Sequence, residues 1–172
     1  MVKKPDILHV IAWEKFTPSY IAFVERNFRH FESHCFFVLG WNSAYYVPRK
    51  ANVIFGHELR KHRRVARLVR LMNTSRKILL HGLFDTCVLG LLAVQPWLLG
   101  RSYWAIWGGD LYDPPSGSWP RRNAHELLRR IVFKRLGHLL TYVGGDVDLA
   151  RQRYGARGAH HECLLYPSNC YR

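Results

Sequence analysis

Mostly apolar runs alternate with helical patterns along the chain, and this alternation limits the possible folds more than any other feature. The apolar runs are residues 6–13, 34–40, 52–56, 77–82, 102–108, 138–144 and 161–167. Strands that are so continuously apolar are typical of a parallel sheet covered on both faces. Helical patterns occupy the segments between most of them, namely 18–31, 57–73, 84–99, 121–137 and 146–155. The sequence therefore predicts an α/β fold, a Rossmann-like doubly wound parallel sheet with helices on both faces.

The length of 172 residues and the 48% hydrophobic content are typical of one packed domain, predicted over residues 1–167. Residues 168–172 would then begin a linker or tail. Segment 84–99 is apolar on every side of its helix, so it is predicted to be buried. The stretch 78–100 contains His81, Asp85 and Pro96 among its apolar residues and is not expected to cross a membrane.

Four cysteines occur without a C-x-x-C spacing, and three of them lie in apolar runs. They are Cys35, Cys87, Cys163 and Cys170. This distribution predicts buried thiols in a reducing cytoplasm rather than a disulfide framework.

Several predicted strands end in glycine, at Gly40, Gly56, Gly82, Gly108 and Gly144. In open parallel sheets, ligands bind beyond the carboxyl ends of the strands, where glycine lets the backbone approach them closely. The motif WGGD places Asp110 at this rim, before a proline-rich loop in which no helix should start cleanly. The motif VGGD does the same for Asp146, which either caps helix 146–155 or faces a ligand. His81 ends strand 77–82 and is either a core histidine or a substrate contact.

A strong positive charge is the second unusual feature, with 26 Lys and Arg against 12 Asp and Glu and a net charge of +14. Such a balance favours a polyanionic partner. On helix 57–73, five arginines fall within about 120° of one another at 100° per residue. They are Arg60, Arg63, Arg64, Arg67 and Arg70. They indicate contact with an anionic membrane or a phosphate, or else an ordinary solvated helix face.

Several other chemistries lack their sequence signatures. There is no zinc-finger spacing, no RNP-like motif and no convincing helix-turn-helix, so nucleic acid is an unlikely partner. The ten histidines include no H-E-x-x-H, and no metal site is expected. The dinucleotide, P-loop and G-x-S-x-G motifs are also missing, and no cofactor is expected.

The order of motifs over about residues 75–170 resembles a known family. The motifs are HGLFD at 81–85, YWAIWGGDLYD at 103–113, SG at 116–117, the basic helix 121–137, GD at 145–146 and LLYPS at 164–168. They are similar to the amino-terminal half of the 4-alpha-L-fucosyltransferase-like glycosyltransferases of enterobacterial common antigen synthesis, which transfer N-acetylfucosamine.

This resemblance implies a GT-B architecture with two Rossmann-like domains. The chain would correspond to the amino-terminal, acceptor-side domain, and the donor domain would be absent from it, so the isolated chain is expected not to turn over nucleotide-sugar. The implied reaction transfers an amino-deoxy sugar from a dTDP-sugar to a polyprenyl-diphosphate-linked saccharide in glycolipid and polysaccharide synthesis. The implied location is peripheral, at the cytoplasmic face of the bacterial inner membrane.

With this resemblance, each candidate residue receives an expected role. Asp110 would position the acceptor hydroxyl or act as its base. Substrate would contact His81, Gly82, Trp107, Gly108, Gly109, Tyr112 and Asp146, and the five arginines would meet anionic lipid or the acceptor diphosphate. The alternative function is a non-catalytic basic module that binds an anionic membrane, a partner chain or nucleic acid.

Overall fold

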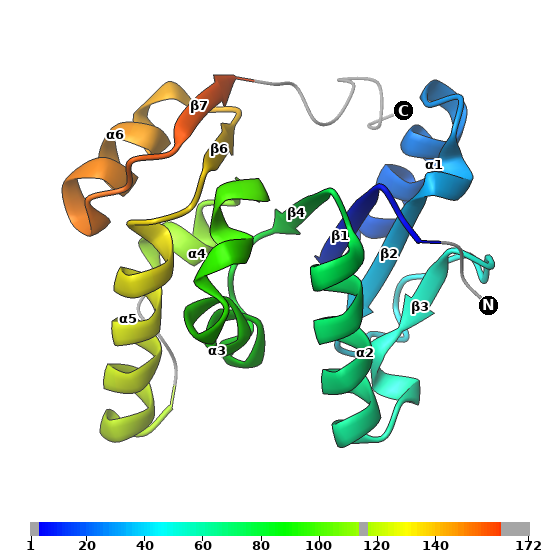
Figure 1. Ribbon diagram of the computed structural model, residues 1–172, viewed down its shortest axis with the longest axis horizontal. Helices are drawn as coiled ribbons and strands as arrows, with labels where there is room; N and C mark the ends of the chain where they lie inside the picture. Colours follow the sequence, from blue (N-terminus) through cyan, green and yellow to red (C-terminus); the bar gives the residue numbers. More distant parts are fainter. Residues whose placement is uncertain (1–3, 114–116, 163–172) are drawn as a thin grey trace. The chain divides into compact units, whose positions relative to one another are not determined.

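A seven-stranded sheet in the order β3-β2-β1-β4-β5-β6-β7 is the framework of the computed structural model, which describes residues 4–113 and 117–162 (Figure 1). The pairs with a defined register, β1–β2, β2–β3, β5–β6 and β6–β7, are all parallel. The predicted Rossmann-like α/β fold is confirmed. The chain forms two compact units, which meet along the chain between residues 79 and 80. The predicted single domain over 1–167 stays a prediction.

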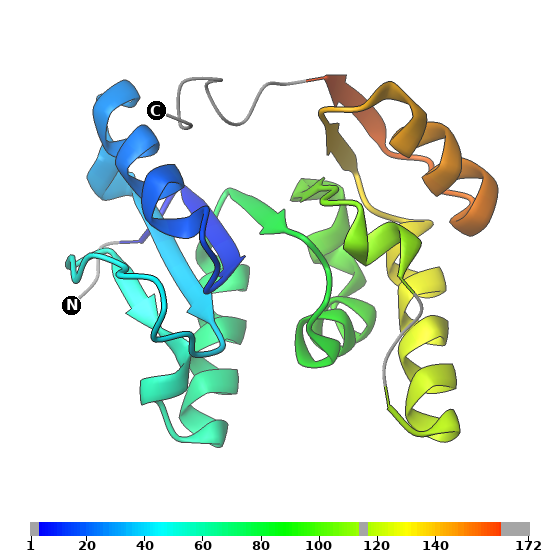
Figure 2. The same ribbon diagram turned by 180° about the vertical axis from the view of Figure 1, so that it is seen from behind.

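The first unit contains strands β1 (Ile7–Ala12), β2 (His34–Leu39) and β3 (Val53–Phe55), the helices α1 (Thr17–Asn27) and α2 (Lys61–Thr74), and short 3-10 turns at Phe31–Ser33 and Gly56–Glu58. Helix α1 covers one face of these strands and α2 covers the other (Figures 1 and 2). The core under α1 is apolar and includes Ile21, Val24, Phe36 and Val38. These two covered faces explain why the strands are mostly apolar, with His9 and His34 as their buried polar residues.

The second unit contains strands β5 (Ser102–Ala105), β6 (His138–Thr141) and β7 (Ala159–Glu162), after strand β4 (Lys77–His81), which begins in the first unit. Its helices are α3 (Thr86–Val94), a 3-10 helix (Pro96–Arg101), α4 (Gly109–Tyr112), α5 (Trp119–Phe133) and α6 (Gly144–Tyr154). The Asp85 carboxylate caps α3 by accepting from Val88 N at 3.0 Å. Trp104 is fully buried, with its ring centroid 4.0 Å from that of Phe133.

Helix α3 differs from the prediction of an entirely buried helix over 84–99. It ends at Val94, because Pro96 cannot continue it, and the chain goes on as a 3-10 helix. Val94 and Trp97 are 69% and 63% exposed. The prediction was therefore wrong for one face of this segment, because apolar composition on every side does not supply packing partners on every side.

The cysteines follow the prediction only in part. Cys35 is fully buried, and burial raises the pKa of its thiol to about 11, so it stays protonated. Cys87 is exposed, so the prediction of a buried thiol was wrong there: it lies in the first turn of α3, on the uncovered face. Cys163, Cys170 and most of the predicted strand 161–167 lie outside the described residues.

Among residues 4–113 and 117–162, no helix combines the length and the apolar character needed to cross a membrane. Within the same ranges, no three His, Cys, Asp or Glu side chains are grouped so as to hold a metal ion.

Candidate functional site

The Asp110 carboxylate lies inside the second unit, with 0% of the residue exposed. Oδ2 accepts hydrogen bonds from Leu83 N at 2.9 Å and from Trp104 Nε1 at 2.5 Å, and Oδ1 accepts from Trp107 N at 3.0 Å. Burial raises the pKa of this carboxyl, and the donated hydrogen bonds oppose that shift. The carboxylate thereby ties the loop after β4 to the end of β5.

The loop after β5 contains the short helix α4, contrary to the prediction that no helix would start there. Helix α4 begins at Gly109, and Asp110 lies in its first turn. Gly108 precedes it with φ of 79°, a left-handed conformation that favours glycine. The WGGD motif is therefore explained in part by local backbone geometry.

Two glycines of the predicted site make room for the protein's own Phe84. A Cβ at Gly82, where φ is +74°, would lie 2.4 Å from the Phe84 ring, and a Cβ at Gly109 would lie 3.3 Å from it. The Phe84 side chain itself remains partly exposed. The close approach that was predicted for a ligand is thus made here by an aromatic side chain at the rim.

Tyr112 and Asp146 come together, as a shared site requires. The Tyr112 hydroxyl donates a hydrogen bond to Asp146 Oδ1, and this bond raises the pKa of Tyr112. Helix α6 begins at Gly144 without a side-chain cap, so the interpretation of Asp146 as a helix cap was wrong. Tyr112 is 53% exposed and Asp146 is buried.

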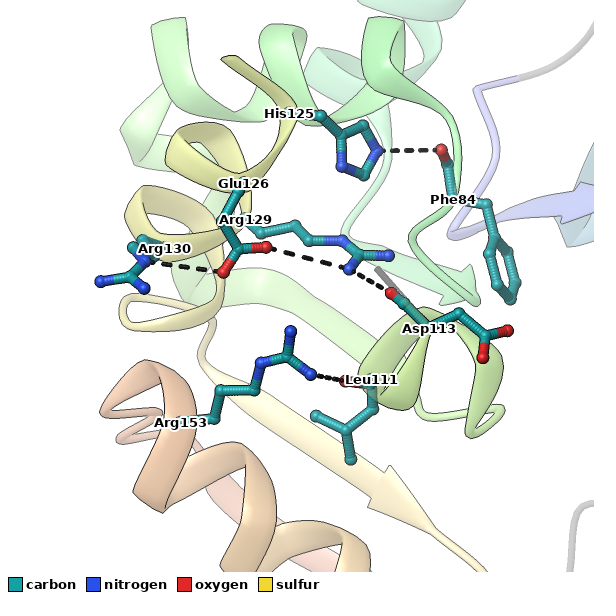
Figure 3. A network of polar contacts seen from close by, with 8 residues as sticks. All are labelled: Phe84, Leu111, Asp113, His125, Glu126, Arg129, Arg130 and Arg153. Carbon is teal, nitrogen blue, oxygen red and sulfur yellow. Dashed lines mark hydrogen bonds and ion pairs between the residues drawn. The ribbon is translucent and has the colours of Figure 1, made fainter. Parts of the chain in front are cut away.

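Two arginines, which the sequence reading did not select, hold the carboxyl end of α4 (Figure 3). Arg129 Nη1 donates to Asp113 O at 3.0 Å, and Arg153 Nη1 donates to Leu111 O at 2.8 Å. Both arginines therefore act on the loop that carries Asp110 and Tyr112.

Helix α5 also fixes the neighbouring loop, and its one acid, Glu126, pairs with two of its arginines. His125 Nε2 lies 3.2 Å from Phe84 O, within hydrogen-bond distance (Figure 3). Glu126 lies 4.0 Å from Arg129 and 3.5 Å from Arg130. The sequence identifies this segment only as a basic helix over 121–137. The spacing of Arg129 from His125, Val132 and Phe133, at four and three residues, was the signal that it shares their buried stripe.

His81 is 3% exposed at the end of β4, and burial lowers its pKa to about 3. It is therefore neutral at physiological pH.

The structure joins Trp107, Gly108, Gly109, Asp110 and Tyr112 in one loop and links them to Gly82 and Asp146. Of the polar side chains among them, Tyr112 is the one with a large exposed surface. Substrate contact by these residues stays a prediction.

The basic helix of the first unit starts later than predicted, at Lys61, with Arg60 as its N-cap residue. Arg63 and Arg70 are exposed, whereas Arg64 and Arg67 are half-buried. No ion pair is formed by any of the five arginines within the described residues. Their predicted contact with an anionic surface stays a prediction, for which Arg63 and Arg70 are best placed.

An aromatic cluster that the sequence reading missed occupies the rim of the first unit. Trp13, Trp41 and His57 each follow the carboxyl end of a strand, β1, β2 and β3 respectively. Their ring centroids lie 4.7–5.2 Å apart. We call these three residues the Trp41 platform. The signal was present in the sequence, since each ring comes within two residues of its strand.

The fold is that of a Rossmann-like α/β protein, a class in which ligands generally bind beyond the carboxyl ends of the parallel strands. A family model described as 4-alpha-L-fucosyltransferase glycosyl transferase group 56 matches residues 44–170. The match covers more than half of the chain, which therefore belongs to this family, and its general activity is glycosyl transfer. No solved structure matches the chain.

Proposed function

We propose that the chain is the acceptor-side part of a GT-B glycosyltransferase. It acts in the transfer of an amino-deoxy sugar such as N-acetylfucosamine from a dTDP-sugar to a polyprenyl-diphosphate-linked saccharide in surface glycolipid synthesis. The observation that carries this proposal is the family match over residues 44–170. The loop built around Asp110, at the carboxyl end of β5, supports it, because ligands of this fold bind at that edge.

Within this proposal, the main role of Asp110 is to hold the loops after β4 and β5 in position. Its carboxylate fixes the backbone of Leu83 and Trp107. Tyr112, which is exposed and joined to Asp146, is the side chain in this loop that is best placed to reach an acceptor hydroxyl. Preorganised groups of this kind lower a barrier by holding the reacting atoms in place.

The transfer reaction is tested in membranes from cells that make the protein. Those membranes should incorporate label from dTDP-N-acetylfucosamine into a lipid-linked saccharide, and deletion of the gene should reduce incorporation at least tenfold. Transfer from UDP-N-acetylglucosamine in the same membranes is the control and should stay unchanged. Undiminished dTDP-sugar transfer after deletion would contradict the proposal.

We also propose that the exposed arginines of α2 bind an anionic membrane surface. Near an anionic bilayer, each exposed arginine contributes about 1 kcal/mol. The double substitution Arg63→Gln and Arg70→Gln should therefore weaken binding to phosphatidylglycerol-rich vesicles by roughly 30-fold, as measured by co-sedimentation. Phosphatidylcholine vesicles should bind neither form.

The matched control for this experiment is Arg151→Gln with Arg157→Gln, two exposed arginines of the second unit. It removes the same charge and should leave most of the vesicle binding intact. Equal losses in the two double variants would show that net charge, and not α2, determines the binding.

A further inference from the structure

The Trp41 platform is a built aromatic surface and not a chance exposure of single rings. Trp13 and Trp41 meet edge to face at 5.0 Å between centroids, and His57 lies 4.7 Å from Trp41 and 5.2 Å from Trp13. Phe55 supports Trp13 from the strand side, with centroids 5.1 Å apart. Each ring is thus held by at least two others, which fixes its orientation.

Hydrogen bonds fix the inner part of the platform. Trp13 Nε1 donates to Tyr45 O at 2.7 Å, and Trp13 N donates to Leu39 O at 2.9 Å. The backbone turns at Gly40, where φ is +75° and, apart from its two chain neighbours, no residue has a heavy atom within 4 Å of the position that a Cβ would take. Trp13 is therefore the fixed ring of the platform, and the backbone next to Trp41 is open at Gly40.

Two features of the platform leave part of it available to a ligand. The Trp41 residue is 63% exposed, although it is a large apolar ring. The Nδ1 atom of His57 is buried and has no hydrogen-bond partner among the described residues. A buried polar atom without a partner costs free energy, so a ligand that supplied one here would gain affinity.

We propose that the Trp41 platform binds a pyranose ring of the acceptor saccharide, an inference that rests on the function proposed above. The ring's C–H face would pack on the exposed indole of Trp41, and one of its hydroxyl groups would pair with His57 Nδ1. An apolar wall with a few fixed polar groups is typical of sites for small ligands. The platform lies at the carboxyl ends of β1, β2 and β3, the edge at which this fold binds ligands.

The contacts of the platform favour a sugar over the diphosphate or the polyprenyl chain. Arg49 is the cation packed on its aromatic support, 5.0 Å from the Phe55 ring, and it already pairs with Glu58. A diphosphate would have to compete with that ion pair. A hydrocarbon chain would leave His57 Nδ1 unpaired in a drier environment.

The test measures indole N–H signals of the purified full chain by NMR during titration with soluble methyl glycosides of N-acetylglucosamine, N-acetylgalactosamine and glucose. At least one of the glycosides should shift the Trp41 signal in a saturable manner, with a dissociation constant in the millimolar range. Trp41→Ala should weaken that binding at least tenfold. His57→Phe, which keeps an aromatic ring and removes Nδ1, should weaken it about fivefold.

Trp119→Ala is the matched control, because Trp119 is 73% exposed and lies in the second unit. It should leave glycoside binding unchanged. No saturable shift with any glycoside would overturn the inference. Saturable binding of dTMP or of phosphatidylglycerol vesicles at Trp41, in place of the glycosides, would overturn it too, because the occupant would then be a base or a lipid.

The two proposals fail separately in these experiments. If gene deletion abolishes dTDP-sugar transfer but the Trp41 signal ignores every glycoside, the platform inference is wrong and the function stands. If the glycosides bind at Trp41 but deletion leaves the transfer intact, the platform binds sugar and the proposed function is wrong.

Discussion

Asp110→Ala is expected to lower the free energy of unfolding by about 3–5 kcal/mol. The substitution removes the acceptor of three hydrogen bonds. It leaves the N–H groups of Leu83 and Trp104 unpaired in a buried site, and that of Trp107 in a partly buried one. Each unpaired buried donor costs about 1–3 kcal/mol. Urea unfolding followed by fluorescence measures the loss, and amide exchange at Leu83 and Trp107 should become faster.

Two further variants make this expectation specific. Asp113→Ala removes an exposed carboxylate from the end of the same short helix and should cost less than about 1 kcal/mol. Asp110→Asn keeps the shape of the side chain but replaces one acceptor oxygen by an NH₂ group, which faces another donor. Its loss of unfolding free energy should therefore lie between those of Asp110→Ala and Asp113→Ala. A stability of Asp110→Ala equal to that of Asp113→Ala would show that the three hydrogen bonds do not hold the loop.

The fold could be predicted because its signal is local and repeated. Each of the first six apolar runs contains a strand, since a strand that is buried on both faces has little room for polar residues. Strand β7 (Ala159–Glu162) is exposed along its length and overlaps the seventh run only at His161 and Glu162. The differences lie at element ends. Helix α2 starts four residues late, since Gly56–Glu58 form a 3-10 turn, and α3 stops before Pro96. Such boundaries depend on caps and turns, which a periodic pattern does not contain.

The candidate site was harder to predict, because the sequence places Asp110 at the correct edge but cannot give the direction of its side chain. Whether that carboxylate points to solvent or to Trp104 depends on tertiary packing. The same limit hid Arg129, a buried cation within a run of exposed ones. The pairing of Trp13 with Trp41 could not be predicted for a different reason: an aromatic residue after a strand is as common in a core as at a binding edge, and only the fold brings these two rings together.

His81 is expected to make the protein less stable in mild acid. Burial lowers its pKa to about 3, whereas in the unfolded chain the pKa is close to the ordinary value of 6.5. The unfolded state therefore binds more protons between these two values, and stability falls as the pH falls. The contribution is fully present above about pH 6.5 and is lost progressively down to about pH 3. By pH 4.5 the loss should reach about 2.5 kcal/mol.

The contribution of His81 is isolated by how the unfolding free energy changes with pH, because a substitution can also change that free energy at every pH. His81→Gln removes the titrating group, so its unfolding free energy should decline about 2.5 kcal/mol less than that of the unmodified protein between pH 7 and pH 4.5. His62→Gln, an exposed histidine on α2, should keep the full decline. Since burial also lowers the pKa of His34, part of the acid loss should persist in His81→Gln. Parallel curves for His81→Gln and the unmodified protein would show that His81 takes up a proton as readily in the folded protein as in the unfolded chain, and would contradict this expectation.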